Sequence, residues 1–277
     1  MNGPLKGVRR TTPLRTLLLL VVASAHGCNP GKPAATNTAV IAADKLDETQ
    51  AIREIERLGG TIKRDGKLPG LPVTAIDFTG SQRFGDKDLS LLKPLKNLTS
   101  LNLSNTQVTD AGLRELGELK NLTTLNLWNT QITDAGLKEL RELKNLTKLD
   151  LGNNLLGGTQ ITNAGLKELR ELKNLTSLDL SGTQITDAGL KELKGLKNLT
   201  TLNLGYTQIT DAGPKELREL KNLTNLNLDH TQITDAGLEE LRELKNLTNV
   251  SLYHTETTDV GLKKLKQSLP SLKINSQ

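Results

Sequence analysis

The sequence predicts an α/β solenoid, with a parallel β-sheet on a concave face and short α-helices on a convex face. The first observation is a repeated segment, LKNLTTLNLWNTQITDAGLKELRE, at residues 119–142. It recurs with small changes in seven units, which begin at Leu95, Leu119, Leu143, Leu172, Leu196, Leu220 and Leu244. The period is 24 residues, except that the third unit spans 29 and therefore carries five extra residues. A fixed period of this length indicates units that stack along one axis.

The second observation is that each unit divides into two halves with different periodicities. In the first half, Leu122, Leu125 and Leu127 follow the pattern L-x-x-L-x-L, whose last part alternates as a half-buried strand does. In the second half, leucines recur every three residues from Leu137 to Leu143, and charged residues fill the gaps. This spacing indicates one apolar stripe of a short helix. Each unit is therefore expected to contain one strand, one turn and one helix.

The pattern resembles the leucine-rich repeat family. Residues 95–268 match it closely, and residues 73–94 match it loosely. The run Leu-x-x-Leu-x-Leu-x-x-Thr-x-Ile-Thr-Asp-Ala-Gly-Leu is most similar to the ribonuclease-inhibitor-like and cysteine-containing subtypes. It departs from the cysteine-containing subtype because Thr130 replaces Cys and each unit is about two residues shorter. The resemblance implies a horseshoe-shaped binding scaffold of a bacterial, exported type, but it names no ligand.

The composition gives no argument for nucleic-acid binding or catalysis. The chain has 36 Lys and Arg against 31 Asp and Glu, but residues 1–27 hold four of the basic residues and no acidic one. Without that segment the numbers are 32 and 31, so no concentrated basic face is expected. The sequence also lacks a phosphate-binding loop, a zinc-type Cys/His spacing and a nucleophile elbow. We therefore expect no enzymatic activity, no cofactor and no metal site.

The first 27 residues have the features of a secretory signal peptide. Three arginines precede an apolar stretch at residues 17–22, which is too short to span a membrane. Residues 23–25, Ala-Ser-Ala, fit ordinary cleavage, whereas residues 25–28 resemble a bacterial lipoprotein box in which Cys28 becomes the lipidated N-terminus. We favour lipidation because Cys28 is the only cysteine and stands where an anchor would stand. The protein is expected to be exported and held at the cell envelope.

The chain divides into four segments: a signal peptide (1–27), a flexible tether (28–44), an N-terminal helical cap with a degenerate first repeat (45–94), and seven repeats with a C-terminal strand cap (95–277). The cap should begin with a helix over residues 45–58, which Gly59 and Gly60 end. Such a helix would cover the open end of the solenoid. Phe78 and Phe84 are expected in its core.

Several positions within a repeat have an expected structural role. Thr130 should point inward, and its hydroxyl should satisfy backbone groups of the turn. Either Thr133 or Asp134 should cap the start of the helix, and the sequence leaves both open. Gly136 should let the helix approach the strand layer closely. Asn145 is suited to a left-handed residue at the end of the helix.

Two registers are open for the unit with five extra residues. In one, Thr159 and Ile161 fill the inward positions, and residues 154–158 loop out. In the other, Asn154 and Leu156 fill them at the normal spacing. We favour the first register because it keeps the run Thr-Gln-Ile-Thr intact.

Three further patterns are interpreted structurally. Asn97-Leu98-Thr99 and its copies match the N-glycosylation sequon, but the repeat already accounts for both polar residues, so glycosylation is not expected. The Lys, Glu and Arg mixture on the helices predicts a solvated face with ion pairs spaced along each helix. Pro214 replaces a leucine of the helix and should fill the core less well.

Partner-binding residues are expected on the concave face, where equivalent strand positions form columns about 4.8 Å apart. Most of these positions are small and polar, so the large or charged ones are the candidates: Trp128, Lys148, Asp150, Asp179, Tyr206, Asp229, His230, Tyr253 and His254. Tyr206, His230 and His254 share one column, and Asp229 and Tyr253 share the next. The two histidines should lie about 5 Å apart, and no third strong metal ligand accompanies them.

These observations predict a non-enzymatic scaffold that binds a macromolecular partner on its concave face. We favour a protein partner over an envelope polysaccharide, and we expect a monomer that contacts the membrane only through a lipid anchor. One alternative is a structural or adhesive envelope component without a specific ligand. Another is an F-box-like adaptor for a ubiquitin ligase, against which the export signal argues.

Overall fold

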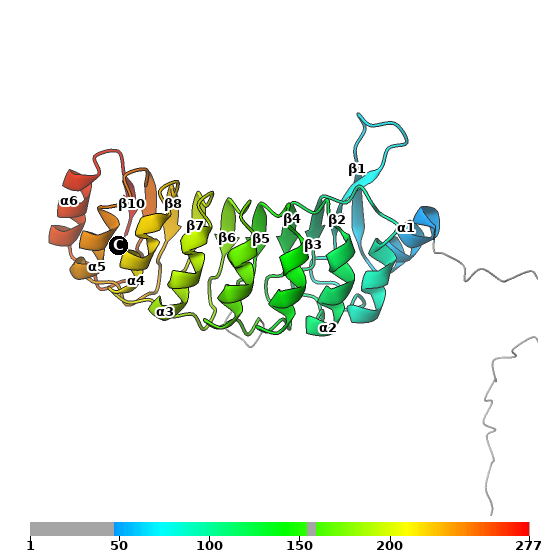
Figure 1. Ribbon diagram of the computed structural model, residues 1–277, viewed down its shortest axis with the longest axis horizontal. Coiled ribbons are helices and arrows are strands. Elements are labelled where there is room, and N and C mark those ends of the chain that lie inside the picture. Colours follow the sequence, from blue (N-terminus) through cyan, green and yellow to red (C-terminus); the bar gives the residue numbers. More distant parts are fainter. Residues whose placement is uncertain (1–46, 154–158, 277) are drawn as a thin grey trace, which may run out of the picture. The chain divides into compact units, whose positions relative to one another are not determined.

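The computed structural model describes residues 47–153 and 159–276. The predicted signal peptide, Cys28 and the tether lie outside the described residues, as do residues 154–158. Ten strands form one sheet in sequence order (Figure 1): β1 Thr61–Arg64, β2 Val73–Asp77, β3 Ser100–Asn102, β4 Thr124–Asn126, β5 Lys148–Asp150, β6 Ser177–Asp179, β7 Thr201–Asn203, β8 Asn225–Asn227, β9 Asn249–Ser251 and β10 Lys273–Asn275. Every pair from β2 to β10 is parallel, and β1 is antiparallel to β2.

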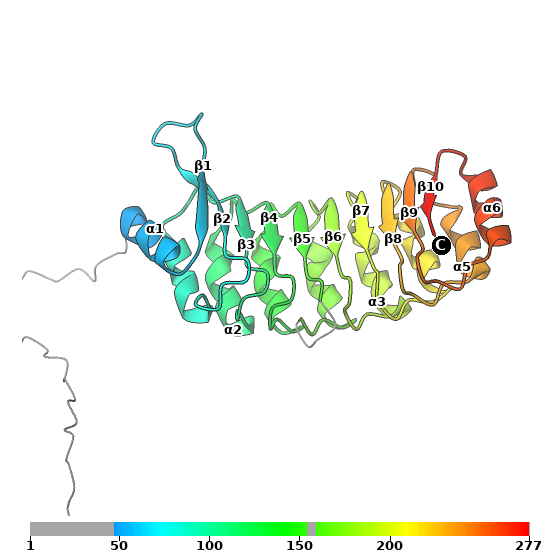
Figure 2. The same cartoon turned by 180° about the vertical axis from the view of Figure 1, so that it is seen from behind.

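The helical segments lie on the side of the sheet opposite to the strands' outer face (Figures 1 and 2). The α-helices are α1 Glu48–Arg57, α2 Asp110–Leu113, α3 Asp187–Leu190, α4 Gly213–Glu216, α5 Asp235–Leu241 and α6 Asp259–Ser268. The 3₁₀ segments are η1 Asp86–Leu92, η2 Arg114–Glu118, η3 Gly136–Glu142, η4 Gly165–Glu171, η5 Lys191–Gly195 and η6 Leu217–Glu219. We call the outer surface of the strands the sheet face and the opposite surface the helix face. The predicted α/β solenoid is confirmed.

The core lies between these two layers and consists mainly of leucine. Leu101 pairs in register with Leu125, and Leu125 with Leu149, so that the inward leucines of neighbouring strands stack along the solenoid. The helical segments are more tightly wound and shorter than predicted, because most of them are 3₁₀ turns or single α-turns. The leucine spacing explains this difference, because leucines three residues apart align on one side of a helix with three residues per turn. Leu137 and Leu140 are fully buried in this way.

The N-terminal end is closed by α1, whose N-cap Asp47 accepts a hydrogen bond from the Gln50 backbone N–H at 2.7 Å. The helix ends where Gly59 adopts a φ of 89°, a conformation that glycine tolerates best. Phe78 and Phe84 stack at a centroid distance of 3.7 Å and are buried, as expected for core residues. The interpretation of residues 45–94 as a helical cap with a degenerate first repeat was incomplete, because it missed β1 and the hairpin that joins it to β2.

The run Thr-Asp-Ala-Gly connects adjacent repeats. Thr133 donates its backbone N–H to Asp110 Oδ1 at 2.8 Å and its hydroxyl to Oδ2 at 2.6 Å. Its own hydroxyl accepts the N–H of Ala135 at 3.2 Å. Threonine is therefore the cap of its own turn, and the aspartate holds the threonine of the next repeat. Equivalent pairs run along the described chain: Asp86–Thr109, Asp134–Thr162, Asn163–Thr186, Asp187–Thr210, Asp211–Thr234 and Asp235–Thr258.

The glycine of this run has a different role from the predicted one. A Cβ atom on Gly136 would lie 2.3 Å from Asp110 Oδ1, and one on Gly165 would lie 2.2 Å from Asp134 Oδ1. Both distances are far below van der Waals contact. Glycine therefore leaves room for the carboxylate of the preceding repeat, rather than for the strand layer.

The inward threonines have the predicted role, and they settle the register of the third unit. Thr130 is buried and donates to the Leu127 carbonyl at 2.7 Å. Thr159 and Ile161 are buried with exposed fractions of 2% and 0%, so the first of the two registers is the observed one. Thr159 donates to the Gly152 carbonyl at 3.3 Å, one residue beyond the carbonyl that the other inward threonines use, because the five extra residues precede it.

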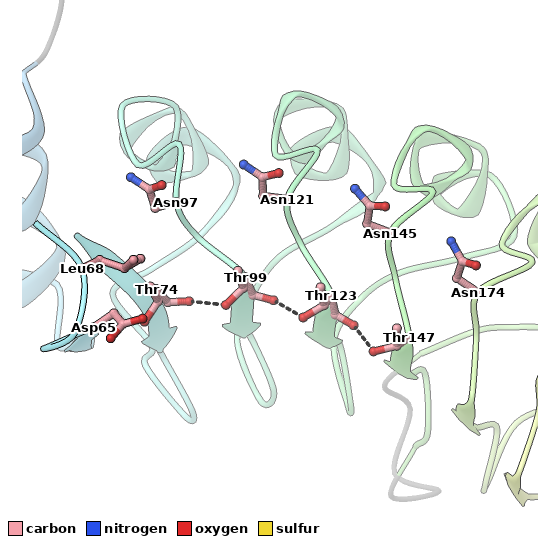
Figure 3. Close-up of a pocket in the computed structure, with 10 residues that line it drawn as sticks. All are labelled: Asp65, Leu68, Thr74, Asn97, Thr99, Asn121, Thr123, Asn145, Thr147 and Asn174. Atoms are coloured by element: carbon pink, nitrogen blue, oxygen red, sulfur yellow. Dashed lines mark hydrogen bonds between the residues drawn. The ribbon is translucent and has the colours of Figure 1, made fainter. Parts of the chain in front are cut away.

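Both polar residues of the N-L-T segments connect one repeat to the one before it. Thr99, Thr123 and Thr147 each donate a hydroxyl to the preceding threonine carbonyl at 3.0 Å (Figure 3). Asn145 donates to the Lys120 carbonyl at 2.8 Å. The prediction of a left-handed backbone at Asn145 was wrong, because its amide, rather than its φ, stabilises this turn. These bonds account for the recurrence of the sequon.

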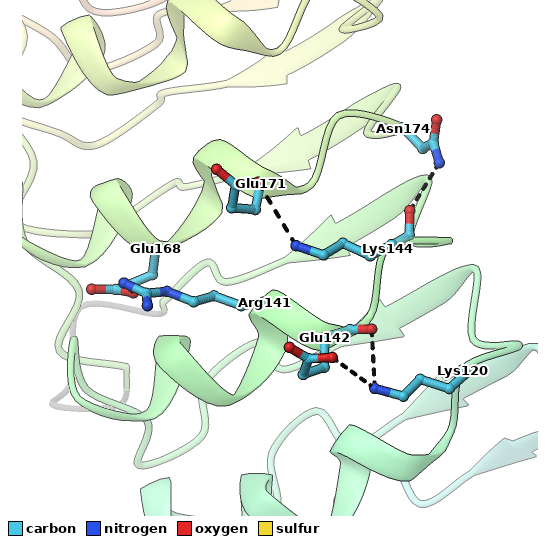
Figure 4. A network of polar contacts seen from close by, with 7 residues as sticks. All are labelled: Lys120, Arg141, Glu142, Lys144, Glu168, Glu171 and Asn174. Carbon is cyan, nitrogen blue, oxygen red and sulfur yellow. Dashed lines mark hydrogen bonds and ion pairs between the residues drawn. The ribbon is translucent and has the colours of Figure 1, made fainter.

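Ion pairs on the helix face run mainly between repeats rather than along helices. Lys120 pairs with Glu142 at 3.0 Å, Lys144 with Glu171 at 3.8 Å, and Arg141 with Glu168 (Figure 4). Among the described residues, only Arg57–Glu54 and Arg242–Glu239 are spaced within one helix. The expected helix-spaced pairs are therefore a minor part of the pattern. The cause is the 24-residue period, which brings identical helix positions side by side.

Pro214 is buried in α4, which begins at Gly213. The corresponding helix of the next repeat, α5, begins two positions earlier in the repeat, at Asp235. In that repeat, Leu238 donates its backbone N–H to the Thr234 carbonyl at 3.3 Å. Proline has no N–H and cannot make this bond. The missing donor is not the sole cause of the late start of α4, because η3 and η4, which have leucine at this position, also begin at the equivalent glycine.

Candidate binding surface

The strand ends on the sheet face turn through residues with left-handed backbone. Six equivalent positions have φ values between 53° and 68°: Asn105, Asn129, Gly182, Tyr206, His230 and His254. Glycine suits this conformation, and asparagine and histidine are enriched in it relative to other residues, whereas tyrosine is strained there. Asn129 fits the pattern further, because its amide donates to Asn105 Oδ1 at 2.7 Å. Tyr206 therefore departs from the residues that this backbone favours, and His230 and His254 are larger than the Asn or Gly of the earlier repeats.

Tyr206, His230 and His254 form one continuous stack of rings. The Tyr206 and His230 centroids are 4.1 Å apart with an interplanar angle of 16°, and those of His230 and His254 are 4.1 Å apart at 31°. The predicted proximity of the two histidines is confirmed. All three side chains are exposed, and 47% of the Tyr206 surface remains accessible. We call these three residues together with Tyr253 the aromatic cluster.

Stability alone gives a weak account of this stack. Stacking contributes about 0.5–1.5 kcal/mol per pair, and a bulky residue in left-handed conformation costs about 1–3 kcal/mol. The three left-handed residues together cost at least about as much as the two stacked pairs contribute. Asparagine at the same positions would avoid most of the strain, so the exposed rings are candidates for recognition.

Asp229 and Tyr253 lie beside the stack. Asp229 is half-buried, and its Oδ1 accepts the Tyr253 backbone N–H at 2.8 Å, so this carboxylate positions the neighbouring strand end. Tyr253 is 41% exposed. The sheet therefore places four of the five C-terminal candidates on the surface and gives the fifth a structural contact.

Asp150 and Asp179 belong to a column that closes the strand-end turns. Asp150 Oδ1 accepts the Gly152 N–H at 3.0 Å, and Asp179 Oδ1 accepts the Ser181 N–H at 2.8 Å. The two aspartates are register partners on β5 and β6. Burial is the main cause that raises the pKa of Asp150 to about 6; the hydrogen bond from Gly152 lowers it in part, and the charge of Asp179 makes a smaller contribution that raises it. These acidic residues have a turn-forming role that explains their presence without a partner.

Trp128 and Lys148 lie apart from the aromatic cluster. Trp128 is half-buried, and its Cδ1 is 2.8 Å from the place where a Gly152 Cβ would stand, so glycine makes room for the indole. Lys148 is exposed on β5. Trp128 follows β4 and Tyr206 follows β7, a separation of about 14 Å at the usual strand spacing. The structure does not bring the two regions together.

Two grooves and one hairpin were not expected. One groove of about 690 Å³ runs along the strand starts and is lined by the Asn and Thr ladders, Asp65 and Leu68 (Figure 3). The other, of about 640 Å³, contains Tyr206 and His230 beside Gln184 and Gln208. The hairpin between β1 and β2 exposes Leu68 and Leu71. Its Pro69-Gly70 turn signal was available in the sequence.

Within residues 47–153 and 159–276, no group of three or more His, Cys, Asp or Glu side chains is arranged to hold a metal ion. In the same part of the chain, no helix combines the length and the apolar character needed to cross a membrane.

Family comparisons agree with this architecture. Models described as leucine rich repeats match residues 95–117, 120–167 (two copies) and 173–233. A search of curated protein sequences found no match.

Solved structures give the same result. Internalin C2 from Listeria monocytogenes is 28% identical with a TM-score of 0.59, covering 74% of this chain and 81% of that one. A leucine-rich repeat protein of Leptospira interrogans is 31% identical with a TM-score of 0.51, covering 67% and 45%. The ectodomain of the Arabidopsis receptor kinase HAESA, solved with a peptide hormone, is 18% identical with a TM-score of 0.56, covering 83% and 41%, and shows the fold alone.

The fold and its stacked strand-turn-helix units define a solenoid of the class whose members are typically non-catalytic binding scaffolds. The chain contains leucine-rich repeats, and its solenoid is structurally similar to leucine-rich repeat proteins of bacteria.

Proposed function

We propose that this protein is a non-enzymatic scaffold that binds another protein through the aromatic cluster on its sheet face. The observation that carries the proposal is the exposed stack of Tyr206, His230 and His254 at positions where earlier repeats have Asn or Gly. Aromatic side chains dominate the binding energy of protein interfaces. The surrounding surface of Ser, Asn, Thr and Gly offers few other anchors.

The test is a variant that restores the residues of the other repeats. Tyr206→Asn, His230→Asn and Tyr253→Gly together copy Asn105, Asn129 and Gly152, so the fold should survive. A partner identified by cross-linking is purified and titrated against wild type and variant. We expect at least about a hundredfold loss of affinity, because several anchors are removed at once.

Two outcomes would contradict this proposal. If the triple variant binds normally while Trp128→Asn weakens binding, the site lies at the other end of the sheet face. If no partner binds saturably, the alternative of a structural or adhesive envelope component is supported. An F-box-like adaptor role would instead require binding to a ubiquitin-ligase subunit, which the same titration can measure.

We further propose that the protein is exported and anchored to the envelope through a lipid on Cys28. The support is the arginine-rich, apolar leader that ends at this cysteine. Wild-type protein should partition into detergent and carry an acyl mass at Cys28, and Cys28→Ser should release it. A mature N-terminus at His26, measured by mass spectrometry, would contradict the anchor.

A further inference from the structure

The hairpin between β1 and β2 carries an apolar tip outside the core. It projects beyond the neighbouring strand connections (Figures 1 and 2). Leu68 and Leu71 are 47% and 50% exposed, and every residue from 66 to 71 is exposed. Neither leucine contributes to the main core, so their apolar character has no role in folding that the described contacts reveal.

Hydrogen bonds hold the turn at the tip of the hairpin in one conformation. Leu71 donates its backbone N–H to the Leu68 carbonyl at 3.2 Å, and Arg64 Nη1 donates to the Leu71 carbonyl at 2.9 Å. Pro69 and Pro72 restrict the backbone beside both leucines. The two side chains are therefore presented together on a short, braced turn, at low conformational cost for a second surface.

The charge around the tip is positive. Lys63, Arg64 and Lys67 are exposed at its base. The acidic residue nearest the tip, Asp65, is half-buried and accepts the Lys67 backbone N–H at 2.9 Å, and Asp77 lies at the far end of β2. Apolar side chains flanked by basic ones match the boundary of a membrane that contains anionic lipid, where the apolar part enters the acyl region and the cations face phosphate groups.

The position of the hairpin in the chain also favours contact with a membrane. The described residues begin at Asp47, with α1 packed against β1, and Asp47 follows Cys28 by 19 residues. A segment of this length spans at most about 65 Å when fully extended. A lipid on Cys28 would thus keep the hairpin end of the solenoid within reach of the bilayer, which raises its effective concentration at the surface.

We infer that the hairpin of residues 61–77 is a membrane-contacting element, which inserts Leu68 and Leu71 into the interface of an anionic bilayer. The inference does not depend on the proposed protein partner. It adds a second membrane contact to the predicted anchor. Such a contact would fix which end of the solenoid faces the lipid.

The test uses a fluorescent probe at the tip, in the full-length chain. Leu68→Trp is mixed with vesicles of phosphatidylcholine and phosphatidylglycerol whose acyl chains are brominated. The matched control is Val260→Trp, because Val260 is also exposed but lies in α6 at the other end of the solenoid. Both variants also carry Trp128→Phe, so that the native tryptophan does not contribute to the fluorescence. This local readout is insensitive to membrane binding by the N-terminal leader, which both variants share.

We expect quenching of the tryptophan introduced by Leu68→Trp and none of that introduced by Val260→Trp. Lys63→Gln with Lys67→Gln should reduce the quenching at low salt and abolish the preference for phosphatidylglycerol. In the Leu68→Trp background, Leu71→Gly should weaken vesicle partitioning about tenfold. Glycine also suits the φ of 48° at that position, so the turn should remain intact.

Equal quenching at both positions, or none at Leu68→Trp, would overturn the inference. So would a partner protein whose binding is lost in Leu68→Asn with Leu71→Gly while vesicle quenching is absent, because the hairpin would then be a protein contact. Loss of partner binding in the aromatic-cluster variant is a separate result and leaves the membrane inference unaffected.

Discussion

Replacement of Asp150 by asparagine should stabilise the protein at neutral pH. Asp150 is half-buried on β5, and Asp179 faces it on the next strand. Burial raises its pKa to about 6 from a usual value of 3.8. Between these values the folded state binds more protons than the unfolded state, so stability decreases as pH rises through this window. Above about pH 6 the full cost of the buried charge is present.

The magnitude follows from the difference in pKa. A change from 3.8 to about 6 corresponds to about 3 kcal/mol at most. Partial solvent access to the carboxylate reduces this to about 2 kcal/mol. Asparagine keeps the turn, because Asn126 and Asn203 in the same column accept the N–H two residues on, at 2.8 Å and 3.1 Å. Asp150→Asn should therefore gain about 2 kcal/mol at pH 7.5 and little at pH 4.

Guanidinium unfolding of both proteins at several pH values measures this difference. Carboxyl NMR should show Asp150 titrating near pH 6. Asp235→Asn is a control of opposite sign, since hydrogen bonds from Thr258 lower the pKa of Asp235. It should destabilise at neutral pH, and the loss should shrink in acid. A pH-independent gain for Asp150→Asn would refute the role of buried charge.

Three other changes test the packing. Gly165→Ala should destabilise the protein by about 2 kcal/mol, because the new Cβ atom would collide with Asp134. Gly117→Ala is the control and should stabilise slightly, because a Cβ atom there meets nothing within 4 Å, and thermal unfolding compares the two variants. Pro214→Leu should raise the free energy of unfolding by about 1 kcal/mol, because more apolar surface is buried, and the guanidinium midpoint should rise. A lower midpoint would show that leucine does not fit at this position. Lys120→Gln should cost less than about 1 kcal/mol, since its ion pair is exposed, and a larger loss would reveal coupling along the solenoid.

The repeat period predicted the fold well, because leucine spacing alone fixes which residues face the core. The bonds between repeats were harder to predict. Asp110 binds Thr133, which is 23 residues away. Thr109, however, lies next to Asp110 in the sequence, so the recurring Thr-Asp pair could equally be explained by a cap within one repeat. Identical repeats hide this distinction, since every local pair also has a copy one period away.

The candidate site was predictable in part. The expectation that equivalent positions of adjacent repeats form columns placed His230 next to His254 correctly. It could not show that Asp150 and Asp179 serve the turns, because a strand pattern only says that a side chain points outward. The hairpin was missed because residues 73–78 resemble a repeat strand and drew residues 61–72 into the same interpretation. The Pro69-Gly70 pair was the available sign of a turn.

The Asp–Thr ladder has a consequence for how this protein changes over evolutionary time. Each junction uses the same side chains, so removal of residues 119–142 would let Asp110 hold Thr162 in place of Thr133. Slippage between near-identical gene segments would then shorten or lengthen the solenoid without creating a new interface. Every such event between the hairpin and the aromatic cluster would shift the cluster by one strand spacing relative to the hairpin. The reach between the two ends is thus a property that copying errors can adjust in discrete steps.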